Sequence, residues 1–198
     1  MKNVKHIVRR GIQRGFTLLE LVVVVAIIGV LIILVAPNLA GSKDSANAVL
    51  LLKTAQDIGN NWMLINQSCG TTTDATSSPV MASGKTAADV IFGGVNNVAD
   101  TYKGCYNLSR VRPMLDAAQP KTGGGWKVAG YDVTIAGGGT QPLRVSYANV
   151  PDALVLMMAQ RYNPSLTALA ASDSASPVVQ YSTATNGTRT VTVLRQVN

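Results

Sequence analysis

One uninterrupted apolar run dominates the beginning of the chain. From Phe16 to Ala36 the sequence reads FTLLELVVVVAIIGVLIILVA, with Thr17 and Glu20 as its polar residues, and the next charged residue is Lys43. At about 1.5 Å per residue, a helix of this length spans roughly 30 Å, the thickness of the hydrocarbon core of a bilayer. The run therefore predicts a single membrane-spanning helix.

Beyond Pro37 the pattern remains helical but becomes amphipathic. Five apolar residues recur three or four positions apart, which places them on one face of a helix: Leu51, Ala55, Ile58, Trp62 and Ile65. A polar sequence containing Cys69 and Gly70 ends the pattern. We predict one long helix over residues 16–66, and we expect its apolar stripe to pack on a sheet rather than to form a ligand groove.

Alternation typical of strands appears late in the chain, over residues 131–135, 143–147, 178–181 and 190–194. A glycine-rich segment joins the first two, and the turn-prone Asn186-Gly187 joins the last two. Between the pairs, residues 152–162 read as a short helix introduced by Pro151. A long helix packed on an antiparallel sheet of about four strands is an α+β fold.

The positive charge of the chain is concentrated before the apolar run. The chain carries 17 basic and 10 acidic residues, for a net charge of +7, and five of the basic residues lie within residues 1–15 without any acidic residue. This asymmetry places the amino terminus in the cytoplasm and the remainder outside. A DNA-contacting patch on the exported part stays open as an alternative to salt bridges between subunits and to solvated positions for Arg110, Arg112, Lys121, Lys127, Arg144 and Arg161.

The scarce residues argue against an enzyme and against a metal or cofactor site. His6 is the single histidine and Glu20 the single glutamate, so the downstream chain has no Ser-His-Asp, Cys-His or HExxH arrangement. Cys69 and Cys105 are the only cysteines. Because export leads to an oxidising compartment, we expect these two cysteines to form one disulfide.

The residues at the start of the apolar run carry a resemblance. The stretch Arg14-Gly15-Phe16-Thr17-Leu18-Leu19-Glu20 combines a basic leader, a glycine, an aromatic residue and a glutamate four positions later, followed by the apolar helix. This combination resembles the class III signal of type IV prepilins and type II secretion pseudopilins. The resemblance covers roughly the first 50 residues, and the rest of the chain resembles this family in architecture only.

The resemblance implies roles for particular residues. Prepilin peptidase would cut between Gly15 and Phe16, and the new amino terminus at Phe16 would be methylated. Glu20 would then pair with the terminal amine of a neighbouring subunit, since both charges are costly alone in lipid, and so set the assembly register. Pro37 predicts a kink, and by analogy with the family the helix from Gly29 to Pro37 unwinds on assembly.

The resemblance also implies a division of the chain and a place in the cell. We expect a single-pass protein of the inner (cytoplasmic) membrane whose carboxyl-terminal domain is periplasmic or extracellular, later assembled into a surface pilus. The four expected parts are a leader peptide, a membrane and filament-core helix, the amphipathic second half of that helix, and an exported globular α+β domain: residues 1–15, 16–37, 38–66 and 67–198.

The function that this resemblance implies first is structural. The chain would be a type IV pilus subunit that polymerises through its amino-terminal helix for adhesion, motility, DNA uptake or conjugation. The implied partners are further copies of itself, prepilin peptidase, membrane lipid before assembly, and an inner-membrane platform with a cytoplasmic ATPase. An outer-membrane secretin joins these partners in a cell that has an outer membrane.

A pseudopilin of type II secretion and a minor pilin with a binding role are the alternatives. Residues 37–43, PNLAGSK, are similar to the sequence that follows the membrane helix in major pseudopilins. Those proteins usually carry an acidic calcium loop near the carboxyl terminus. In this chain Asp173 is the single acidic residue near that end, without a DxDxG-like cluster.

Overall fold

The computed structural model describes residues 17–196, and it describes the side chains of all of these except residues 33–42. The chain consists of two compact units, Met1–Gly41 and Ser42–Asn198. The described part of the first unit is helical. It belongs to α1 (Leu18–Cys69), whose last part lies in the second unit.

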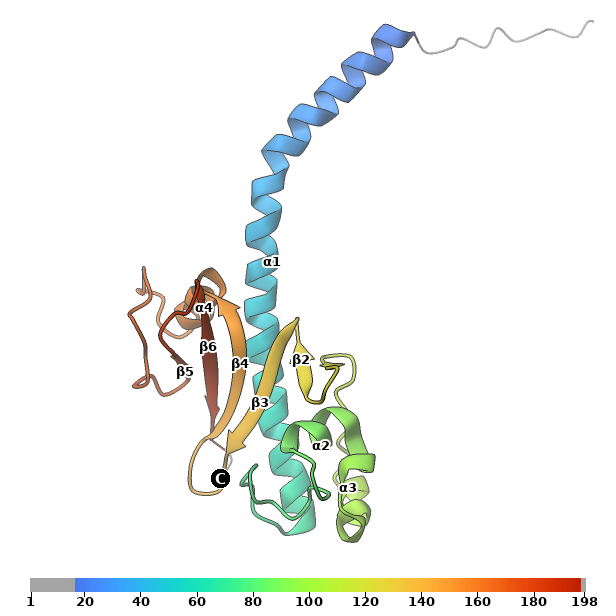
Figure 1. Ribbon diagram of the computed structural model, residues 1–198, viewed down its shortest axis with the longest axis vertical. Helices are drawn as coiled ribbons and strands as arrows, with labels where there is room; N and C mark the ends of the chain where they lie inside the picture. The colour runs from blue at the N-terminus through green and yellow to red at the C-terminus, as the bar shows by residue number, and fades with distance from the viewer. Residues whose placement is uncertain (1–16, 197–198) are drawn as a thin grey trace, which may run out of the picture. The chain divides into compact units, whose positions relative to one another are not determined.

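The second unit is an α+β fold in which α1 runs along one face of an antiparallel sheet (Figure 1). The sheet has six strands in the order β1-β2-β3-β4-β6-β5. The strands are β1 (Gln119–Pro120), β2 (Trp126–Val128), β3 (Tyr131–Gly137), β4 (Leu143–Pro151), β5 (Val179–Tyr181) and β6 (Thr188–Arg195). The further helical elements are α2 (Ala87–Gly93), η1 (Gly94–Asn97), η2 (Asp100–Tyr102), α3 (Lys103–Leu108) and α4 (Asp152–Gln160).

The fold class predicted from the sequence is confirmed, but the strand count of about four is too low. The two extra strands, β1 and β2, have two and three residues and lie in a glycine-rich segment, so they are too short to show alternation. Tertiary contacts position them. The indole Nε1 of Trp126 donates a hydrogen bond of 2.9 Å to Oδ1 of Asp89 on α2, and the Trp126 ring lies 5.4 Å from that of Phe92.

The turn before β6 follows directly from its sequence. Asn186 and Gly187 both have positive φ, at 52° and 73°, and Thr185 pairs with Thr188 across them. A tight hairpin turn with two left-handed residues matches the natural twist of the flanking strands, and Asn-Gly is the dipeptide that adopts it most easily. The turn that the sequence indicates at this position is therefore present.

The core lies between α1 and the sheet. The predicted stripe Leu51, Ala55, Ile58, Trp62 and Ile65 is fully buried. It packs in one cluster with apolar residues of the sheet, among them Val145, Tyr147 and Val191. The hydroxyl of Tyr147 donates a hydrogen bond of 2.8 Å to the Leu51 carbonyl oxygen. Because burial raises the pKa of Tyr147 well above its ordinary value, this hydroxyl stays protonated and remains a donor.

A buried hydrogen-bond network holds the chain after α1 against the end of that helix. Asn66 is fully buried, and its Oδ1 accepts hydrogen bonds from the hydroxyls of Thr71, at 2.8 Å, and Ser78, at 2.6 Å. The Trp62 indole donates to the carbonyl oxygen of Thr73 at 2.6 Å. Since buried polar groups are costly when unpaired, this network fixes where the chain turns back.

Replacing Asn66 by alanine should therefore destabilise the second unit. The Asn66→Ala variant leaves the Thr71 and Ser78 hydroxyls without their shared acceptor, which should lower the free energy of unfolding by about 1–3 kcal/mol. Urea unfolding of the full chain in detergent would measure the change. Gln67→Ala is the matched control, because Gln67 is the next residue on α1 and is exposed. Equal stability of the two variants would contradict a structural role for the network.

Candidate assembly site

The side chains of Thr17 and Glu20 cap the amino terminus of α1. The backbone amide of Glu20 donates a hydrogen bond of 3.2 Å to the Thr17 hydroxyl. In return, Oε2 of Glu20 accepts a longer one of 3.4 Å from the Thr17 amide. This is a capping box, in which a threonine and a glutamate three residues later satisfy each other's amides. The negative carboxylate also lies at the positive end of the helix dipole.

The sequence analysis gave Glu20 an assembly role and missed this local one. The signal was available, because Thr17-Leu18-Leu19-Glu20 has the spacing of a capping box. The two roles are compatible in one residue. In the single chain the carboxylate has its own helix end as a partner, so any partner on another subunit would compete with this cap.

The first turns of α1 expose an apolar surface on all sides. Over residues 18–32 the large apolar side chains are between 46% exposed, at Val24, and 81% exposed, at Leu18. Apart from Gly29, its two chain neighbours and the nearby backbone of the helix itself, no atom lies within 4 Å of the position that a Cβ on Gly29 would occupy. We call residues 18–32 the apolar helix surface. A continuous exposed apolar surface of this kind marks a site of interaction with protein or lipid.

Within residues 17–196, no helix has both the length and the apolar character that are needed to cross a membrane.

Several predicted site residues lie outside the described part of the chain. Gly15 and Phe16, the expected cleavage site and methylated residue, precede it. Pro37 falls within α1, but its side chain is among those not described. The backbone from Gly29 to Pro37 is helical in this single chain, and the kink and unwinding on assembly stay predictions.

The predicted disulfide between Cys69 and Cys105 is present, with a Cα–Cα distance of 5.1 Å. It joins the last residue of α1 to α3, which lies 36 residues further along the chain. The sequence did not indicate α3 itself, because this six-residue helix has no apolar periodicity of its own. The disulfide therefore anchors a short helix that depends on tertiary contacts.

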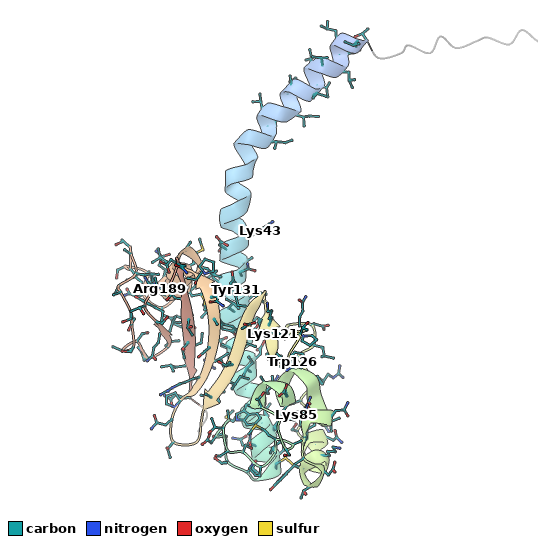
Figure 2. The ribbon with its side chains drawn as sticks, viewed as in Figure 1. Lys43, Lys85, Lys121, Trp126, Tyr131 and Arg189 are labelled. Carbon is teal, nitrogen blue, oxygen red and sulfur yellow. A yellow bond between two sulfur atoms is a disulfide. The ribbon has the colours of Figure 1, made fainter. Side chains whose placement is uncertain are left out.

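Two of the basic residues considered for DNA contact are engaged within the chain. Lys121 Nζ lies 2.7 Å from one carboxylate oxygen of Asp132, and Lys127 Nζ lies 3.9 Å from the other. The hydrogen bond from Lys121 holds the pKa of Asp132 below its usual value. Figure 2 shows Lys121 beside Trp126 on the β2 side of the sheet. Both ion pairs lie within one chain, so the predicted salt bridges between subunits stay a prediction.

The start of the chain is similar to that of type IV pilin-like proteins. A family model described as the prokaryotic N-terminal methylation motif matches residues 10–36. This match covers the end of the leader from Arg10, the glycine-aromatic junction, the capped glutamate and the apolar helix surface, and it confirms the resemblance seen in the sequence.

Several curated proteins that are similar to this chain share one name, type II secretion system core protein G. The chain is 39% identical over 80 residues to the type II secretion system core protein G of Escherichia coli, a match covering 35% of this chain and 55% of that protein. It is 62% identical over 39 residues to the protein of the same name from Klebsiella michiganensis, covering 20% and 28%. The Klebsiella pneumoniae protein is 63% identical over 35 residues, covering 18% and 25%.

The matched segments thus span between a quarter and just over half of these relatives' lengths. No solved structure matches the chain.

Substitutions can separate the two roles of Glu20, as the cap of α1 and as the predicted charge partner of a neighbouring subunit. Glutamine also serves at this position of a capping box, so Glu20→Gln keeps the cap and removes the charge, whereas Glu20→Ala removes both. If charge pairing sets the register, both variants should enter assemblies about tenfold less than wild type, because pairing offsets a penalty of several kcal/mol in lipid. Mass spectrometry of assemblies from cells that express variant and wild type together gives the ratio. Normal entry of Glu20→Gln would refute the register hypothesis.

Removing the disulfide should destabilise the second unit. Cys69→Ser opens the loop closed between residues 69 and 105, which should cost roughly 4 kcal/mol in the chain-entropy description. Urea unfolding measures this cost, and Cys69→Ser/Cys105→Ser serves as the control for the thiol that the single variant leaves. If Cys105 in native wild-type protein reacts with an alkylating reagent, the bond is not formed in the cell.

Proposed function

We propose that this chain is a structural subunit of a type II secretion pseudopilus, polymerising through α1. The apolar helix surface carries this proposal, because a helix exposed on all sides over residues 18–32 requires neighbouring helices or lipid around it. The relatives named type II secretion system core protein G support the secretion apparatus as its setting. The sequence analysis put the type IV pilus first, and these relatives reverse that order.

Processing would prepare the helix for assembly. Cleavage between Gly15 and Phe16 removes all five leader cations and creates an amine four residues before Glu20. An isolated charge is expensive in a membrane, so the amine of one subunit and the Glu20 carboxylate of its neighbour stabilise each other at one axial offset. The carboxylate would exchange its contact with Thr17 for this stronger, charged partner.

The partners and locations follow from this role. Before assembly the chain would lie in the inner membrane with a cytoplasmic amino terminus, and prepilin peptidase would process it there. A platform with a cytoplasmic ATPase would add subunits, and a secretin would serve in a cell with an outer membrane. The division into a leader, two helix parts and an exported domain (residues 1–15, 16–37, 38–66 and 67–198) belongs to this proposal, and no catalytic role is assigned.

A type IV pilus subunit is the second candidate, including a minor pilin with a binding role. It is favoured by the part of the chain that the relatives do not match, at least 65% of its length against the Escherichia coli protein. Adhesion, motility, DNA uptake and conjugation are the roles that this candidate covers.

The two candidates predict different locations for the processed chain in native cells. For a pseudopilin, the peptide that begins at methylated Phe16 should remain mostly in the membrane fraction, and deletion of the chain should block export of secreted proteins. Mass spectrometry of the membrane fraction and of sheared surface filaments measures this distribution. The control is a Gly15→Leu variant, in which the cleavage site is changed and the processed peptide should be absent.

Abundant processed chain in sheared filaments, with protein secretion intact after deletion, would contradict the pseudopilin proposal and support the pilus. An amino terminus other than Phe16 in every fraction would contradict both candidates.

A further inference from the structure

The segment between α4 and β5 is a long connection with little regular structure. We call residues 161–178 the C-terminal loop. Asp173 ties this loop to the sheet through two backbone hydrogen bonds with Tyr181, of 2.9 and 2.8 Å. Its carboxylate Oδ1 accepts from the amides of Ala175, at 2.9 Å, and Ser176, at 3.0 Å. The Asp173 side chain therefore holds a turn of the loop itself.

One buried cation connects this loop to the rest of the fold. Arg189 on β6 is only 8% exposed, and it lies beside α4 and the C-terminal loop (Figure 2). Its Nε donates a hydrogen bond of 2.8 Å to Oδ1 of Asp152 at the start of α4. Its Nη1 donates to the carbonyl oxygens of Ala170, at 2.9 Å, Ala171, at 2.5 Å, and Ser182, at 3.1 Å.

Through the Arg189 side chain, β6 is joined to three other segments of the chain. Asp152 opens α4, Ala170 and Ala171 belong to the C-terminal loop, and Ser182 follows β5. The ring of Tyr181 completes the surroundings, with its centroid 5.4 Å from the guanidinium carbon. A buried guanidinium needs several acceptors, and these carbonyls and the carboxylate provide them.

Three main-chain carbonyls and one carboxylate are also the kinds of oxygen that a hard divalent cation binds. Pseudopilins, as noted in the sequence analysis, usually carry an acidic calcium loop near the carboxyl terminus, but the donor set here does not fit calcium. Calcium takes six to eight oxygen ligands. The oxygens that converge in this region already surround a guanidinium, and residues 17–196 contain no cluster of three acidic, histidine or cysteine side chains suited to a metal.

We propose that Arg189 is an internal cation that organises the C-terminal loop in the way that a bound divalent ion would. The guanidinium is covalently part of β6 and carries its charge at any physiological pH. The order of the loop is therefore independent of divalent cations in the medium. This inference concerns the fold of the second unit and does not rest on the proposed function.

Hydrogen exchange of the full chain in detergent tests the proposal directly. The amides of the C-terminal loop and of residues 179–182 should exchange at the same rate in EDTA and in millimolar calcium. Arg189→Met should speed exchange in these residues by about tenfold or more, because hydrogen bonds to a charged group are lost. Arg144→Met is the matched control, since Arg144 lies on the neighbouring strand β4 and is exposed, and it should leave the loop protected.

Two results would overturn the proposal. If EDTA speeds exchange of the wild-type loop, a bound metal and not Arg189 supplies the cation. If Arg189→Met leaves loop exchange unchanged, the guanidinium does not organise the loop. Should Arg189→Met raise exchange throughout the second unit, Arg189→Lys decides the question: it keeps the charge but cannot form the forked contacts. Exchange in Arg189→Lys that rises only in the loop, or stays at the wild-type rate while Arg189→Met is faster, supports the proposal. Exchange raised throughout the second unit in Arg189→Lys as well contradicts it.

Discussion

The packing of one stripe of α1 on the sheet is the contact on which the second unit depends. Leu51, Ile58 and Trp62 contribute large side chains that are fully removed from water, and the sheet offers a matching apolar face. Burial of this size is the dominant favourable term in folding. The hydrogen bond from Tyr147 to the Leu51 carbonyl adds direction to a contact that is otherwise non-directional, and so helps to fix how far along the helix the sheet lies.

The elements that the sequence predicted are those in which apolar residues recur with a regular period. The stripe from Leu51 to Ile65 repeats at about 3.6 residues, and the segments that form β3, β4, β5 and β6 show the pattern of strands, so pattern alone located them. β1, β2, α2 and α3 are short and are held by particular long-range contacts, such as Trp126 with Asp89, which no local pattern announces. Arg189 was missed for the same reason: its partners lie between 7 and 37 residues away.

The assembly site also combines features that the sequence predicted with features that it did not. The glycine-aromatic-glutamate motif indicated Glu20, and the family match at residues 10–36 includes this residue. Its role in assembly stays a prediction. The capping box was visible in the spacing of Thr17 and Glu20 but is evident only when the helix start is known. The disulfide was predictable because the chain has two cysteines and the sequence predicts export, while the helix that it anchors was not predictable.

The position of the disulfide has a mechanical consequence for any filament built on α1. Tension that reaches the second unit through α1 would load the packed stripe in shear. The far end of that stripe is where the Asn66 network and the bond from Cys69 to Cys105 lie. A covalent link at the end opposite the pull limits how far the helix can slide along the sheet. Under tension we therefore expect the packing at this end of α1 to be lost last.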